Sequence, residues 1–149
     1  SPSELTESFM SYDDNNIFAK ILRGEIPNNT IYEDEHVLAF HDITPQRPVH
    51  ILVIPKGAYV NMDDFTEKAS DAEITALFRA TGKVARELGL GDSGYRLISN
   101  SGPDGHQEVQ HLHFHILGGA PAGPMLKKID AGKSLGDDSL SPDGLRRGF

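Results

Sequence analysis

The stretch that decides the fold reads His111-Leu112-His113-Phe114-His115-Ile116-Leu117-Gly118-Gly119, in which three histidines alternate with apolar residues. Successive side chains of a strand point to opposite faces, so the three histidines are predicted to share one face at ~6.6 Å intervals. Leu112, Phe114 and Ile116 share the other face and are predicted to pack on the core. A row of imidazoles indicates a chemical site, because solvated strand faces more often carry Thr, Lys or Glu.

Two kinds of site use alternate histidines. A zinc ion accepts imidazole ligands, but His111 and His115 would lie ~13 Å apart along the strand, too far to share one ion comfortably. Such an ion would need two of the trio and another ligand, for example His50 or His41. In the other kind of site, one imidazole forms a covalent bond to the substrate, and a neutral imidazole nitrogen can attack phosphorus. The spacing alone leaves both interpretations open.

Five short strands are predicted from apolar runs bounded by Pro, Gly, Asn or Asp. They cover Thr30–Glu33, 37–43, 49–54, 95–99 and 109–117. Most connections between strands are short, which favours an antiparallel sheet with helices packed on it, an α+β fold. Because an open sheet edge is a liability in so small a domain, pairing with a second copy as a homodimer is expected.

Two helices are predicted. The longer one spans residues 71–88, where Ser70 and Glu73 match a capping box and apolar residues recur at helical spacing. The shorter one begins after Asn15 or Asn16 and ends at Gly24.

The composition limits the class of protein. The chain has 149 residues, of which 38% are hydrophobic, and this fits one domain. We expect a flexible arm at 1–15, a domain at 16–119 and a tail at 120–149. The sequence has no apolar run long enough to span a bilayer, no signal-peptide pattern and no cysteine, so we expect a cytoplasmic protein without membrane contact. The net charge of −8 argues against nucleic-acid binding.

The histidine run and the Ile-Leu-Gly-Gly that follows it resemble the signature of the histidine-triad (HIT) family. The resemblance covers most of the chain, and its Leu-Gly-Gly ending is similar to the bacterial nucleoside-phosphoramidase branch. It implies the HIT-like fold, a five-stranded antiparallel sheet with two main helices, and a homodimer. Other matching segments are Ile17-Phe18, Gly24-Glu25-Ile26-Pro27, Phe40-His41-Asp42-Ile43, Pro48-Val49-His50-Ile51 and Gly94-Tyr95-Arg96.

The resemblance also implies roles for individual residues. His113 matches the family's nucleophile, His115 the histidine that contacts the phosphate and the leaving group, and His111 and His50 the supporting histidines. Asp42 is expected to face the ribose hydroxyls. The whole nucleotide pocket is expected to comprise Ile17, Phe18, Ile21, Phe40, His41, Asp42, Ile43, Asn100, Gly105, Gln107 and Val109.

The implied activity is hydrolysis of purine nucleoside 5′-phosphoramidates or related nucleotidyl compounds through a covalent nucleotidyl-histidine, with no cofactor. Alternatives are a nucleotide-binding or signalling protein with incidental hydrolysis, a dinucleoside-polyphosphate hydrolase and a zinc hydrolase. Many relatives carry a Cys-x-x-Cys pair that binds structural zinc where this chain has Asn16 and Ala19, so no metal is expected. His106 also departs from the pattern, because relatives commonly have glycine there.

Overall fold

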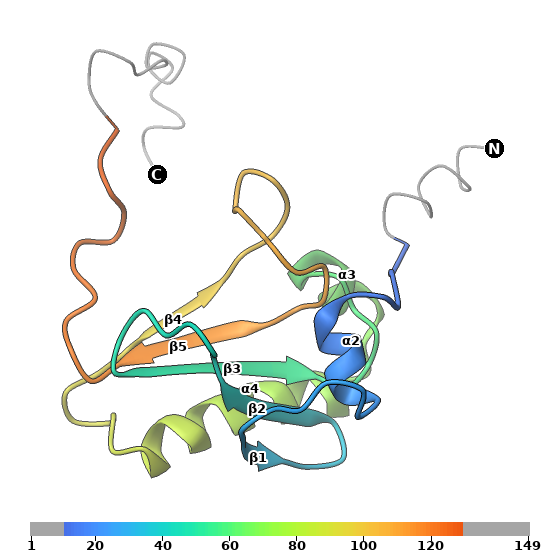
Figure 1. Ribbon diagram of the computed structural model, residues 1–149, viewed down its shortest axis with the longest axis horizontal. Helices are drawn as coiled ribbons and strands as arrows, with labels where there is room; N and C mark the ends of the chain where they lie inside the picture. The colour runs from blue at the N-terminus through green and yellow to red at the C-terminus, as the bar shows by residue number, and fades with distance from the viewer. Residues whose placement is uncertain (1–10, 130–149) are drawn as a thin grey trace.

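A five-stranded antiparallel sheet organises the protein, whose computed structural model describes residues 11–129 (Figure 1). Its strand order is β1-β2-β3-β5-β4. The strands are β1 (Thr30–Glu33), β2 (Val37–His41), β3 (Val49–Pro55), β4 (Arg96–Ser99) and β5 (Phe114–Gly118), and the helices are α2 (Ile17–Leu22), α3 (Met62–Lys68) and α4 (Asp71–Glu87). The predicted α+β fold is therefore confirmed.

One face of the sheet is covered by α4 (Figure 1). The capping box predicted at its start is present, because Ser70 accepts from the backbone N–H of Glu73 and the Glu73 carboxylate accepts from the backbone N–H of Ser70. Its apolar side packs on inward-facing residues of the strands, and this forms the larger core. The core includes Val37, Ala39, Ile51, Val53, Leu77, Val84, Leu112, Phe114 and Ile116. Burial of these side chains is the main source of stability.

The opposite face of the sheet carries α2 and a second apolar cluster, formed by Phe18, Ile21, Leu38, Phe40, Leu52 and Ile54. The α2 helix has only six residues, and the side chain of Asn16 caps it by accepting from the N–H of Ala19. In β3, His50 alternates with Ile51 and therefore faces the same side as Leu52. The α2 side of the sheet is thus the side on which histidines gather.

The last strand is shorter than predicted. The sequence alternation predicts a strand over 109–117, whereas β5 begins at Phe114. The N–H of Leu112 donates to the carbonyl of Tyr59, in the loop before α3, instead of to a neighbouring strand. Leu112 and Phe114 nevertheless lie in the larger core, so the predicted apolar face is confirmed.

A third helix, α3, is absent from the predicted elements. Asn61 caps it, and only Met62 and Phe65 among its seven residues are large and apolar. That is too few to produce a helical hydrophobic period. None of the helices within residues 11–129 is long and apolar enough to cross a membrane.

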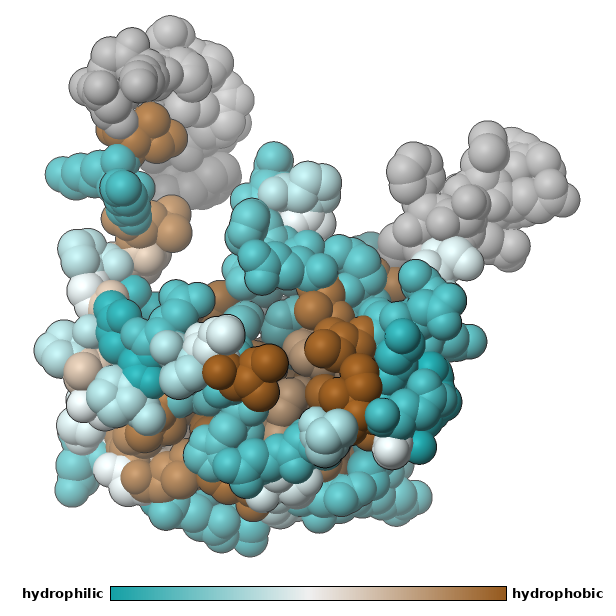
Figure 2. Space-filling view, viewed as in Figure 1, coloured by the Kyte–Doolittle hydropathy of each residue, from teal (hydrophilic) through white to brown (hydrophobic). Residues whose placement is uncertain are grey.

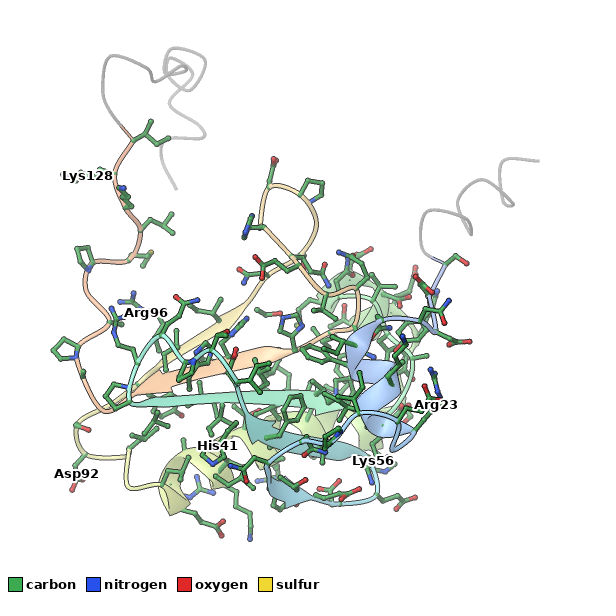
Figure 3. The ribbon with its side chains drawn as sticks, viewed as in Figure 1. Arg23, His41, Lys56, Asp92, Arg96 and Lys128 are labelled. Carbon is green, nitrogen blue, oxygen red and sulfur yellow. The ribbon has the colours of Figure 1, made fainter. Side chains whose placement is uncertain are left out.

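After β5 the chain runs along the side of the molecule as an extended segment. Arg47 donates to the carbonyls of Pro121 and Ala122, and Arg96 donates to those of Gly123 and Pro124. Figure 3 shows Arg96 beside this segment. Most of the predicted arm and most of the predicted tail lie outside the described residues.

Candidate active site

A pocket of about 340 Å³ lies on the α2 side of the sheet. Figure 2 shows hydrophobic side chains gathered around a hollow at the centre of this face, with hydrophilic residues around them. Nine of its lining residues are among those predicted for the site: Ile17, Phe18, Ile21, Asp42, Ile43, Asn100, Val109, His113 and His115. The structure thus joins residues from the short helix, the β2–β3 loop and the histidine run.

The lining differs in chemistry from one part to another. Ile17, Phe18, Ile21, Ile26 and Pro27 form an apolar wall from α2 and the chain that follows it. Asn100, His106 and Glu108 provide polar lining from the connection between β4 and β5. Such an arrangement suits a ligand with a flat apolar group and a polar remainder.

The tautomer of His113 is fixed by the backbone carbonyl of His111, two residues earlier in the chain. His113 Nδ1 lies 2.7 Å from the carbonyl oxygen of His111, and a carbonyl can only accept, so Nδ1 carries the hydrogen. The ring is buried and makes an edge contact with Phe18, with centroids 4.9 Å apart. The lone pair of the neutral ring is therefore on Nε2, the nitrogen that a nucleophile would use.

His115 and His50 are joined by a hydrogen bond. The backbone N–H of Gln46 donates to His50 Nδ1 at 3.1 Å, so the hydrogen of neutral His50 is on Nε2. His50 Nε2 lies 2.9 Å from His115 Nδ1, which must accept. The hydrogen of His115 is consequently on Nε2. Because His113 and His115 have ring centroids 5.0 Å apart, one phosphate group can contact both rings.

His111 lies behind the other two histidines of the trio. It is fully buried, and its Nε2 donates to the carbonyl of Pro55 at 2.8 Å. Its Nδ1 accepts from the hydroxyl of Tyr12. Tyr12 falls in the segment predicted to be an arm, and no feature of the sequence indicates this contact between residues 99 positions apart.

Burial keeps these histidines neutral near pH 7. Desolvation is the largest cause in each case, because the charged imidazolium loses water that the neutral ring does not need. It lowers the pKa of His111 and of His115 to about 4, and it also lowers the pKa of His50 and of His113. A neutral His113 can act as a nucleophile without first losing a proton.

Comparison with known proteins agrees with this geometry. The model of the HIT domain matches residues 23–122, which include the sheet, α3, α4 and the three histidines of the run. This chain belongs to the HIT family. An uncharacterized HIT-like protein of Azospirillum brasilense is 61% identical over 79% of the chain and 97% of its own length.

Two further HIT relatives are informative. The purine nucleoside phosphoramidase of Escherichia coli K12 is 44% identical over 74% of this chain and 92% of its own length. A solved HIT family hydrolase from Clostridium thermocellum is 42% identical, covers 77% of this chain and 99% of its own, and superposes with a TM-score of 0.70. The predicted family and fold are therefore confirmed.

Several predicted site residues lie outside the lining of the HIT pocket. Phe40 packs behind Phe18, with ring centroids 5.6 Å apart, and His41 is exposed on β2. Gln107 is buried, and its amide accepts from the N–H of Gly102 and donates to the carbonyls of Val60 and Val109. At Gly105 an added Cβ would meet the backbone of Ser101 at 2.6 Å. Gln107 and Gly105 thus hold the shape of the loop beside the pocket.

One cluster of HIT-site residues could hold a metal ion. The ligand atoms of Asp42, His50 and His115 all lie within 4.8 Å of one another. A metal on His50 Nε2 would require the hydrogen to move to Nδ1, where the N–H of Gln46 already donates. That conflict disfavours a metal ion here and favours a hydrogen-bonded proton path.

Proposed function

We propose that this HIT protein hydrolyses purine nucleoside 5′-phosphoramidates through a covalent nucleotidyl-histidine at His113. The observation that carries the proposal is the hydrogen bond from His113 Nδ1 to the His111 carbonyl. It leaves the Nε2 lone pair of a neutral imidazole in a pocket of nucleotide size. The 44% identity to a purine nucleoside phosphoramidase supports the choice of substrate.

The reaction has two steps. With the substrate phosphate bound, His115 carries a second proton on Nδ1. His113 Nε2 attacks the α-phosphorus, the P–N bond breaks, and the departing amine takes the Nε2 proton of His115, which leaves His115 as a neutral imidazole. Water then attacks the phosphorus, the P–Nε2 bond breaks, and His115 Nε2 takes a proton from the water. The products are a nucleoside monophosphate and an amine, and these steps need no cofactor.

The base and the ribose of the substrate match the apolar and the polar lining of the pocket. The apolar wall that includes Phe18 and Ile21 would hold the purine base, and Asp42 would accept from the ribose hydroxyls. Asn100 and the backbone of its loop would donate to the phosphate oxygens.

Rapid quenching of a reaction with a radiolabelled adenosine 5′-phosphoramidate tests the proposal. The wild-type protein should trap a nucleotidyl adduct, whereas His113→Ala should trap none and lose several orders of magnitude in kcat. The matched control His36→Ala removes a histidine outside the pocket and should retain both signals. Turnover by His113→Ala within about tenfold of wild type would show that His113 is not the nucleophile.

A further inference from the structure

Asp42 is held in one orientation beside the paired histidines. Its Oδ1 accepts from the N–H and the hydroxyl of Thr44, at 2.8 and 3.1 Å. Its Oδ2 is therefore directed at His50, and lies 3.3 Å from Nε2. The side chain is only 17% exposed, so its charge is less screened than that of a surface carboxylate.

The hydrogen on His50 Nε2 thus has two acceptors within reach. In the free protein it can point to His115 Nδ1 at 2.9 Å, because that nitrogen carries a lone pair. If His115 gains a second proton, its Nδ1 also becomes a donor, and two hydrogens would then face each other. The hydrogen of His50 cannot move to Nδ1, where the N–H of Gln46 donates. The Asp42 carboxylate is the neighbouring group that can accept instead.

We propose that Asp42 is the counter-ion that holds a proton on His115 Nδ1, so that His115 can give its Nε2 proton to the departing amine. The inference rests on the proposed function. When the substrate phosphate enters, His115 gains a proton from solvent, and a small rotation of the His50 ring directs its Nε2–H to Asp42 Oδ2. The carboxylate offsets the imidazolium charge in a site that otherwise disfavours it.

The proton count is consistent through the cycle. In the first step His115 passes from imidazolium to the neutral Nδ1–H form, as the amine takes the Nε2 proton. In the second step water returns a proton to Nε2 and restores the imidazolium. Asp42 keeps its negative charge throughout and only accepts hydrogen bonds, so it is a positioning residue and not the acid itself.

The surroundings of His115 favour Asp42 over the other acidic neighbour. Four titratable groups act on His115: His113 and His50 oppose its charge, and Asp42 and Glu108 favour it. Glu108 is 77% exposed and pairs with His106 at 3.0 Å. Water screens such a pair strongly, so the largely buried Asp42 has the stronger effect.

The test compares two leaving groups on one nucleoside. An alkylamine must be protonated to leave, whereas 4-nitrophenolate leaves without a proton. Both substrates are used at saturating concentration, so that a lost ribose contact of Asp42 affects binding and not the measured rate. We expect Asp42→Asn to slow single-turnover adduct formation at least ~100-fold with the phosphoramidate but less than ~3-fold with the 4-nitrophenyl ester. As the pH rises, the rate of adduct formation from the phosphoramidate should begin to fall at a lower pH for Asp42→Asn than for wild type.

Two other variants complete the design. Thr44→Val removes one hydrogen bond to Oδ1 and should give a smaller loss, again confined to the phosphoramidate. Asp92→Asn makes the same chemical change in an exposed turn far from the pocket (Figure 3), and should leave both rates unchanged. A thermal melt of each variant checks that the protein is folded.

Each remaining outcome overturns a specific statement. Equal loss with both substrates would mean that Asp42 acts only on the ribose or on the shape of the pocket, and no loss with either would mean that it is dispensable. Either result overturns the role of Asp42 while the proposed function stands. Absence of any adduct on wild-type protein with both substrates would overturn both proposals.

Discussion

The hydroxyl of Tyr12 donates to Nδ1 of His111, and this bond satisfies the second nitrogen of a fully buried imidazole. Replacing Tyr12 with phenylalanine would leave that nitrogen without a partner, which typically costs about 1–3 kcal/mol. We expect Tyr12→Phe to lower the free energy of unfolding by this amount, measured in urea. Tyr95→Phe, which removes the hydroxyl of a 43% exposed tyrosine, should have little effect. Equal effects of the two substitutions would contradict the prediction.

The buried histidines predict how stability depends on pH. An unfolded histidine has a pKa near ~6.5, whereas burial lowers the pKa of His111 and of His115 to about 4. The unfolded chain therefore binds more protons, and the free energy of unfolding should fall as the pH drops from about 6.5 to 4. Each such proton contributes a slope of about 1.4 kcal/mol per pH unit.

Urea denaturation at several pH values measures this slope. His111→Gln should reduce it by about one proton, whatever the change in absolute stability. His41→Gln removes an exposed histidine and serves as the matched control. An unchanged slope for His111→Gln would mean that His111 takes up its proton equally well in the folded protein.

His106 has a backbone conformation that favours glycine. Its φ is 58°, and the left-handed region costs a non-glycine residue about 1–2 kcal/mol. Among residues 11–129 the side chain pairs only with the exposed Glu108, and such a pair contributes little to stability. His106→Gly should therefore raise the free energy of unfolding by up to about 1 kcal/mol. Gly102→Ala, in the same loop at φ 67°, should lower it, and a lower stability of His106→Gly would show that the histidine side chain supports the loop.

The free edge of β4 predicts a homodimer. Among residues 11–129, β4 pairs only with β5, and Tyr95 and Leu97 beside that edge are each 43% exposed. A second copy would cover both the unpaired backbone and these apolar groups. Light scattering should give twice the monomer mass of 16.3 kDa, and Leu97→Lys should shift it toward the monomer. Ile43→Lys changes an exposed residue at the pocket and should leave the measured mass at that of the dimer. A monomer mass for the wild-type protein would exclude the dimer.

The sheet was largely predictable because its strands carry strong local signals. The capping box at Ser70 and the nearly continuous apolar runs of β2 and β3 are visible in short windows of sequence. The start of β5 was not predictable, because the alternation continues through His111 while the backbone there bonds to Tyr59. Here a contact distant in sequence decides where the strand begins.

The candidate site was likewise predictable only where the sequence carries a local signal. The grouping of the three histidines could be predicted from their spacing, and that of Asp42 from the family resemblance. Which nitrogen of His111 carries the hydrogen could not be predicted, because Pro55 and Tyr12 decide it from distant positions. The buried hydrogen bonds of Gln107 likewise depend on Val60, in a loop that no sequence motif connects to it.

The short helix α2 supplies most of the apolar wall of the pocket. The backbone of β3 orients His111, and the backbone of the chain before β5 orients the reactive His113. A six-residue helix held by one cap and a small apolar cluster can accept new side chains without moving the sheet. Substitutions in α2 can therefore change which base is bound without changing the reaction at phosphorus. Selection can act on base specificity and on catalysis independently.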